Sequence, residues 1–169
     1  MKLFSFSLAS LFALVSLMGC KKELSLEQSA SYIKEAQDFK AFLTDKNFRL
    51  TAFYTDTPID YVENDAEVKS ETNLWSYVSG YLKDDTNTFH DDLTVDIAQN
   101  AIVMPGLTTA VLSRTYSIGS DGVGVYMQFL DYEYNPLTYR LKEISADHFI
   151  IYFLWKNGIS LYSRFDLLP

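Results

Sequence analysis

The chain has 169 residues, 48% of them hydrophobic, and a formal net charge of −8, which fits a single globular domain. An acidic surface repels phosphate backbones, so this charge argues against nucleic acid as a partner. It also argues against adsorption to anionic lipid, and attachment to a membrane would therefore need a separate anchor.

The first twenty residues have the pattern of an export signal. Lys2 provides a positive start, and residues 3–18 are uncharged and mostly apolar but slightly too few for a transmembrane helix. The segment ends in Leu17-Met18-Gly19-Cys20, which resembles a lipobox, with a branched apolar residue three positions before the cysteine and a small residue directly before it. We therefore expect a signal peptide over residues 1–19 and a lipid on Cys20.

Cys20 is the only cysteine of the chain, so no disulfide forms within it and the sequence holds no zinc site of the cysteine type. Lys21 follows, rather than aspartate, and by resemblance to the sorting rules of bacterial lipoproteins this favours the outer membrane. Residues 21–23 leave open whether the periplasmic or the external face carries the protein. We expect residues 20–25 to form the anchor and a short tether, and residues 26–169 to form the exported domain.

A helix is predicted over residues 26–44. Ser25-Leu26-Glu27-Gln28 has the form of a capping box, in which the serine and glutamine side chains each bond the other residue's backbone. Apolar residues then recur at spacings of three and four, which indicates a helix packed on a core through one face. This apolar face consists of Tyr32, Ile33, Ala36, Phe39 and Leu43.

Beyond the helix the apolar residues recur with a period of two, which predicts strands. In the first strand Phe48, Leu50, Ala52 and Tyr54 alternate with mostly polar residues, although Phe53 interrupts the pattern. A short helix is expected within residues 72–78, ending at Gly80. Seven further strands, separated by short turns, are predicted over residues 86–90, 93–97, 110–118, 123–130, 137–144, 149–155 and 159–167.

Eight consecutive strands with short connections are expected to pair as antiparallel neighbours. Closing them removes the exposed edges, so the predicted fold is mainly β, an eight-stranded up-and-down barrel with an N-terminal helix. A two-sheet β-sandwich is the alternative, because turns alone do not show closure. Strand 149–155 is apolar on both faces, so we expect the helix at 26–44 to cover its outer face, and an exposed partner-binding patch is the rival interpretation.

The block Phe48-Arg49-Leu50-Thr51-Ala52, the run Leu82-Lys83-Asp84-Asp85 leading to Phe89, and the last hairpins resemble the small lipocalin-like lipoproteins of Gram-negative bacteria. The resemblance covers residues 46–168. In that family tryptophan often stands where this chain has Phe48, and a cysteine often precedes the Lys-Asp-Asp run, where this chain has Tyr81 or Leu82. The resemblance implies an up-and-down barrel and no reaction, since most members have no assigned activity.

The sequence contains no recognisable catalytic or metal-binding pattern. His90 and His148 stand alone, and neither His-x-x-x-His nor Gly-x-Ser-x-Gly occurs. The acidic residues at 84–85 and 91–96 lack the Asp-x-Asp-x-Asp-Gly order of a calcium loop. We therefore expect a protein that is not an enzyme and that uses no cofactor or metal.

Arg114 lies on the more apolar face of its predicted strand, and an inward guanidinium needs either a barrel carboxylate or an anionic ligand as its partner. We expect the barrel to bind a small apolar or amphipathic ligand, with Arg114 at its polar end. The other predicted lining residues are Leu50, Leu112, Tyr116, Val125, Met127, Leu141 and Leu161. The alternative is a barrel filled by these side chains, with a surface that acts as an interaction or inhibitor module for an envelope protein partner.

Overall fold

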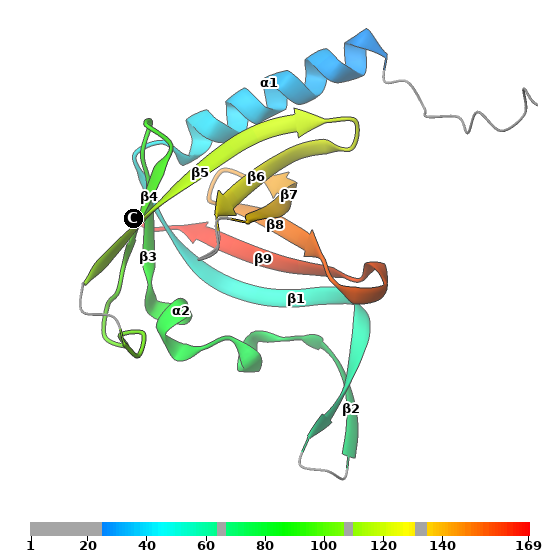
Figure 1. Ribbon diagram of the computed structural model, residues 1–169, viewed down its shortest axis with the longest axis vertical. Coiled ribbons are helices and arrows are strands. Elements are labelled where there is room, and N and C mark those ends of the chain that lie inside the picture. Colours follow the sequence, from blue (N-terminus) through cyan, green and yellow to red (C-terminus); the bar gives the residue numbers. More distant parts are fainter. Residues whose placement is uncertain (1–24, 64–66, 107–109, 131–134) are drawn as a thin grey trace, which may run out of the picture.

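The computed structural model describes residues 25–63, 67–106, 110–130 and 135–169 (Figure 1). The predicted signal peptide, Cys20 and nearly all of the tether lie outside the described residues. The elements are α1 Leu26–Leu43, β1 Lys46–Glu63, β2 Glu67–Asn73, η2 Trp75–Tyr77, α2 Gly80–Asp84, β3 Thr86–Phe89, β4 Thr94–Ala98, β5 Val111–Asp121, β6 Gly124–Leu130, β7 Pro136–Ile144, β8 His148–Leu154, η3 Lys156–Gly158 and β9 Ser160–Leu167.

The predicted helix and its capping box are confirmed in α1. The Ser25 hydroxyl accepts a hydrogen bond from the backbone N–H of Gln28 at 3.1 Å, and the Gln28 side chain accepts one from the backbone N–H of Ser25 at 3.3 Å. The helix lies against β5 and β6. Phe39 and Leu43, in its second half, are fully buried, so α1 is held to the sheet mainly through its C-terminal turns.

All strands of the described residues belong to one antiparallel sheet, and eight of them close into a ring. Each strand from β3 to β9 pairs with the next, β1 pairs with β3, and β1 also pairs with β9. The expected pairs between neighbouring strands are confirmed, with Leu141 opposite Ile151, Phe153 opposite Leu161 and Leu50 opposite Phe165. The first strand is therefore paired on both sides and leaves no open edge at residues 48–54.

The sheet has nine strands where eight were predicted, because β1 continues past Pro58 to Glu63 and a further strand returns beside it. This strand, β2, pairs with the far end of β1 outside the ring and occupies residues that were expected to be irregular or helical. The expected short helix at 72–78 is only the single turn η2. Gly80 starts α2 instead of ending a helix, since a glycine alone does not distinguish the two ends.

A bulge in β1 explains why Phe53 interrupts the predicted alternation. The pairing of β1 with β9 shifts by one residue between Leu50 and Ala52. Beyond the shift Phe53 is on the inner face, opposite Ser163, while the Tyr54 ring stacks on the ring of Tyr162 outside with centroids 5.1 Å apart. The expectation that Leu50, Ala52 and Tyr54 share one face is therefore wrong.

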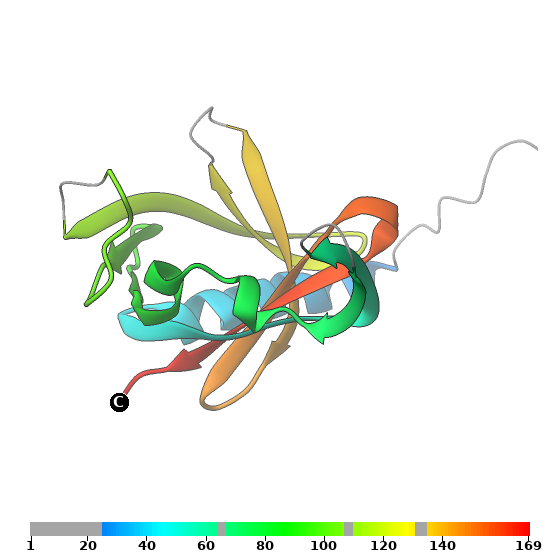
Figure 2. The same cartoon turned by 90° about the horizontal axis from the view of Figure 1, so that it is seen from below.

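The two ends of the ring differ. At the closed end α1 crosses the ring, and its Phe39 and Phe42 rings lie 5.5 and 6.5 Å from the ring of Phe149. At the open end the segment containing η2 and α2 crosses in front of the ring, with α1 behind, in the view from below (Figure 2). The closed end is thus filled by aromatic side chains, and the open end is covered only in part.

The helix does not cover the outer face of strand 149–155, contrary to the sequence-based expectation. Phe39 contacts Phe149, which belongs to the core inside the ring. Outside, the ring of Tyr152 lies 5.5 Å from that of Tyr162, and Leu154 is 67% exposed. The strand is apolar on both faces because its inner face joins the core, while part of its outer face packs on tyrosines of the same sheet.

Candidate functional site

An apolar cavity of about 290 Å³ lies inside the ring. Seven strands and α2 contribute to its walls. The lining residues are Leu50, Leu82, Asn87, Phe89, Val95, Ile97, Met127, Phe129, Tyr139, Phe149, Ile151, Ser163 and Phe165. Ten of the thirteen are apolar, so the cavity suits an apolar guest with few polar groups.

The register of the strands brings these residues together. Phe89 lies opposite Val95 across β3 and β4, and Met127 lies opposite Tyr139 across β6 and β7. Residues directly opposite each other in an antiparallel pair share one face of the sheet. The period-two alternation of each strand therefore continues around the ring as a single apolar inner surface.

Three polar side chains reach this surface. The Asn87 amide donates a hydrogen bond to the backbone carbonyl of Phe48 at 3.4 Å. Burial raises the pKa of the Tyr139 hydroxyl, which keeps it protonated and able to donate. Together with the Ser163 hydroxyl, these groups are the polar positions of an otherwise apolar lining, and ligand pockets commonly combine an apolar wall with a few such groups.

Two of the eight residues predicted to line a ligand site, Leu50 and Met127, line this cavity. Leu161 lines a different pocket. Tyr116 and Val125 belong to the buried core, and Leu141 packs against that core. The Tyr116 hydroxyl donates to the backbone carbonyl of His90 at 3.1 Å, and burial raises its pKa to about 12.

Leu112 and Arg114 lie at the open half of β5, outside the cavity lining. They stand opposite Ile97 and Val95 in the pairing of β4 with β5. The register therefore places Arg114 on the inner face, as predicted, but not among the cavity residues. Sequence reasoning missed the lining residues of β3 and β4, although these strands were predicted and the alternation Asn87-x-Phe89 and Val95-x-Ile97 marks their inner faces.

A buried carboxyl group lies at the end of α2. Asp85 is 3% exposed, and its Oδ1 has no hydrogen-bond partner among the described residues. Burial, and secondarily the neighbouring Asp84, raises the pKa of Asp85 to about 6. Asp84 Oδ2 accepts from the backbone N–H of Ile102 at 2.9 Å, which ties the segment between β4 and β5 to α2.

His90 does not form a hydrolytic triad with the carboxylate and hydroxyl beside it. Asp96 lies between His90, whose Nε2 is 3.2 Å from Asp96 Oδ2, and Ser113, whose hydroxyl donates to Asp96 Oδ1. A hydrolytic triad requires the hydroxyl to contact the imidazole rather than the carboxylate. Within the described ranges no three His, Cys, Asp or Glu side chains converge as metal ligands would.

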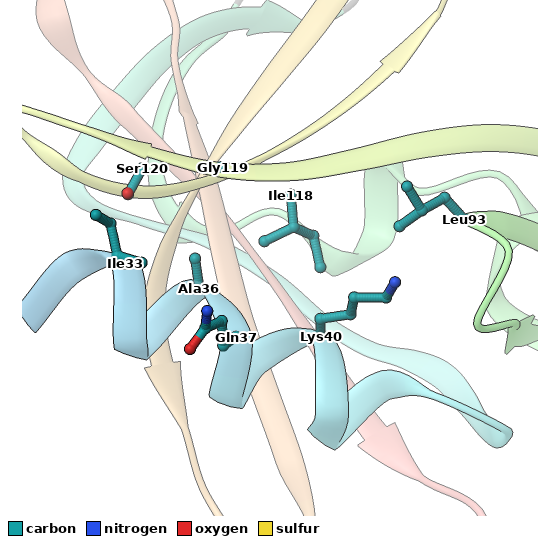
Figure 3. Close-up of a pocket in the computed structure, with 8 residues that line it drawn as sticks. All are labelled: Ile33, Ala36, Gln37, Lys40, Leu93, Ile118, Gly119 and Ser120. Atoms are coloured by element: carbon teal, nitrogen blue, oxygen red, sulfur yellow. The ribbon is translucent and has the colours of Figure 1, made fainter. Parts of the chain in front are cut away.

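Further hollows lie at the surface of the described residues. A groove of about 370 Å³ runs between α1 and β5, where Ile33 and Ala36 of the helix face Ile118, Gly119 and Ser120 (Figure 3). It is less apolar than the interior cavity, since Gln37, Lys40 and Ser120 also line it.

The second hollow, of about 520 Å³, lies where β7 and β8 separate, beyond the last pair of Arg140 with Tyr152. The third, of about 270 Å³, lies at the open end between η2 and η3. We call this third hollow the open-end pocket; its lining residues are Phe53, Ile59, Leu74, Tyr77, Trp155 and Leu161.

No protein-family model and no curated protein matches the chain. None of the described helices is long and apolar enough to cross a membrane. The interior cavity is the most enclosed of the hollows and is lined from the largest number of strands, which makes it the leading candidate for a functional site.

Proposed function

We propose that the protein is a lipid-anchored envelope lipoprotein that binds, without catalysis, a small apolar or amphipathic ligand inside a lipocalin-like barrel. The interior cavity is the observation that carries this proposal. A dry cavity of about 150 Å³ lined by Leu, Ile and Phe is enough to hold benzene. A cavity of about 290 Å³ therefore suits an apolar group of roughly twice that size.

The entrance to the cavity lies beside α2. Leu82 lines the cavity and is also 42% exposed, so this side chain borders both the interior and the solvent. At the opposite end, Phe39 and Leu43 are fully buried within the core cluster. A ligand therefore enters at the open end, past Leu82, and meets the polar groups of Asn87, Tyr139 and Ser163 inside.

The interior site is tested with the neutral fluorescent probe N-phenyl-1-naphthylamine, titrated into the chain carrying Cys20→Ser. Asn87→Phe places a ring in the cavity, whereas Asn87→Ala removes the same amide and keeps the space. We expect saturable binding with one probe per chain, weakened at least about tenfold by the phenylalanine and not by the alanine. Equal binding by both variants would contradict the interior site.

The anchor is supported by Leu17-Met18-Gly19-Cys20 and by the position of α1. The chain enters the described domain at Ser25, at the closed end, only five residues beyond Cys20. At most about 3.5 Å per residue separates them, so the lipid would hold the closed end within roughly 20 Å of the membrane surface. Metabolic labelling with a radioactive fatty acid tests this, and labelling that persists in Cys20→Ser would refute it.

A second candidate function, a surface interaction module, is favoured by the open end. Nine of the twelve exposed large apolar residues of the described chain lie there. They are Tyr77, Leu82, Ile102, Val103, Val111, Leu130, Leu137, Leu154 and Trp155. Photo-crosslinking from residue 154 in cells distinguishes the two functions. A single discrete crosslinked protein would favour the interaction module if the purified protein also failed to bind N-phenyl-1-naphthylamine.

A further inference from the structure

The open-end pocket differs from the interior cavity in being lined by apolar groups alone. The two hollows share no lining residue. Leu74 and Leu161 form the floor and are 7% and 6% exposed, whereas Tyr77 and Trp155 form the walls and are 50% and 42% exposed. Two large aromatic surfaces thus remain in water beside a buried apolar floor, and covering them would be favourable at roughly 25 cal/mol per Å².

The pocket is held in shape by backbone contacts. The backbone N–H of Leu74 donates to the carbonyl of Phe53 at 2.9 Å, which fixes the segment before η2 against β1. Leu161 lies opposite Thr55 in the pairing of β9 with β1. Trp155 precedes η3, and its backbone N–H donates to the carbonyl of Ile159 at 2.8 Å. A concave site whose floor is fixed in this way suits the insertion of a single apolar ligand chain better than it suits contact with a flat surface.

A cationic side chain lies beside the pocket although the whole chain carries −8. Lys156 Nζ lies 5.9 Å from the centroid of the ring of Trp155, which lines the pocket. An apolar hollow with an ammonium group beside one of its aromatic side chains is complementary to a molecule with an apolar chain and an anionic head.

We propose that the open-end pocket binds the apolar chain of a free anionic amphiphile, with Lys156 beside its anionic head. A free ligand molecule is favoured over a lipid bilayer by the place where the polypeptide enters the domain. Residues 1–24 join the domain at Ser25, at the closed end, so this choice rests on the anchor proposed above at Cys20, which would hold that end to the membrane and the pocket away from it. This site is additional to the interior cavity and does not depend on ligand binding there.

Trp155 reports directly on the pocket. The chain has two tryptophans, so Trp75→Phe leaves Trp155 as the only one. In the Cys20→Ser chain carrying this change, dodecanoate below its micellar concentration should shift the Trp155 emission to the blue with saturation. Dodecanol should bind about three- to fivefold more weakly, the contribution of one exposed ion pair. An unshifted emission, or equal affinity for dodecanoate, dodecanol and dodecyltrimethylammonium, would overturn the proposal.

Two variants distinguish the contribution of the ligand's apolar chain from that of its anionic head. Lys156→Gln should reduce the affinity for dodecanoate to that for dodecanol and leave dodecanol unaffected. Ile59→Asn places an amide in the apolar lining and should weaken both ligands, whereas Leu154→Asn, outside the lining and 67% exposed, should change neither. Circular dichroism and the unfolding midpoint verify that each variant is folded, and a folded Ile59→Asn with unchanged affinity would count against the pocket.

Two controls separate this site from its rivals. Asn87→Phe fills the interior cavity and should leave the Trp155 response to dodecanoate intact; loss of the response would mean that dodecanoate acts through the interior. Vesicles of phosphatidylcholine with phosphatidylglycerol test the bilayer. If the vesicles shift Trp155 and sediment the protein while monomeric dodecanoate does neither, the pocket is a membrane contact and the proposal is wrong.

Discussion

The closed and open ends of the ring are built from the same alternating strands but differ in how completely their side chains are packed. At the closed end Phe39, Leu43, Phe48 and Phe149 are fully buried, and the rings of Phe149 and Phe165 stack with centroids 5.0 Å apart. At the open end lie the cavity mouth, the open-end pocket and most of the exposed apolar side chains. A helix packed on one end concentrates buried contacts there and leaves more apolar surface exposed at the other end.

The largest expected effect is that of removing an aromatic ring from the closed end. Phe149 contacts the rings of Phe39, Phe48 and Phe165, so Phe149→Ala should lower the free energy of unfolding by about 3–5 kcal/mol. Leu154→Ala on the same strand, at a side chain 67% exposed, should change it by less than about 0.5 kcal/mol. Urea denaturation measures both, and similar losses would end the distinction between the two ends.

A smaller effect is expected from the buried carboxyl group of the open end. The pKa of Asp85 is about 6 in the folded protein, above its ordinary value of 3.8, so protonation favours the fold. Its contribution to stability is fully present below pH 3.8 and is lost as the pH rises through about 6.

Asp85→Asn should therefore match the parent protein at pH 3.5 and exceed its stability by about 2 kcal/mol above pH 7. The quantity to measure is the difference in unfolding free energy between variant and parent at each pH. The contributions of the other carboxylates are common to both proteins and therefore cancel in this difference. A difference that does not change with pH would show that Asp85 does not lie in an apolar environment that disfavours its charged form.

The smallest effect concerns the start of α1. Ser25→Ala removes the serine side chain's half of the capping box and should cost the helix about 1 kcal/mol. Because Phe39 and Leu43 attach the other half of the helix to the core, the first turn can fray without opening the closed end. Hydrogen exchange should quicken at residues 26–29 and stay slow at residues 39–43; faster exchange along the whole helix would show that the closed end depends on its cap.

Much of the fold was predictable because it is encoded locally. The capping box and the apolar spacing gave α1, and Asn157-Gly158 marked a tight turn in which both residues have positive φ angles, of 60° and 76°. The candidate site was less predictable. Leu50 and Met127 were assigned to the lining, but Asn87, Phe149 and Ser163 were not, because membership depends on how neighbouring strands are aligned.

By itself the sequence determined that the chain forms one helix and a series of antiparallel strands, since periodicity and turn residues act over a few positions. It also determined the order of pairing from β3 to β9, since the connections there leave each strand beside the next. Only the tertiary structure decided which faces point inward beyond the bulges at Leu50/Ala52 and Leu141/Glu143, because one extra residue reverses the faces of a strand. It alone decided that α1 closes an end rather than a side, and that the ring holds a cavity, because packing volume depends on all the strands at once.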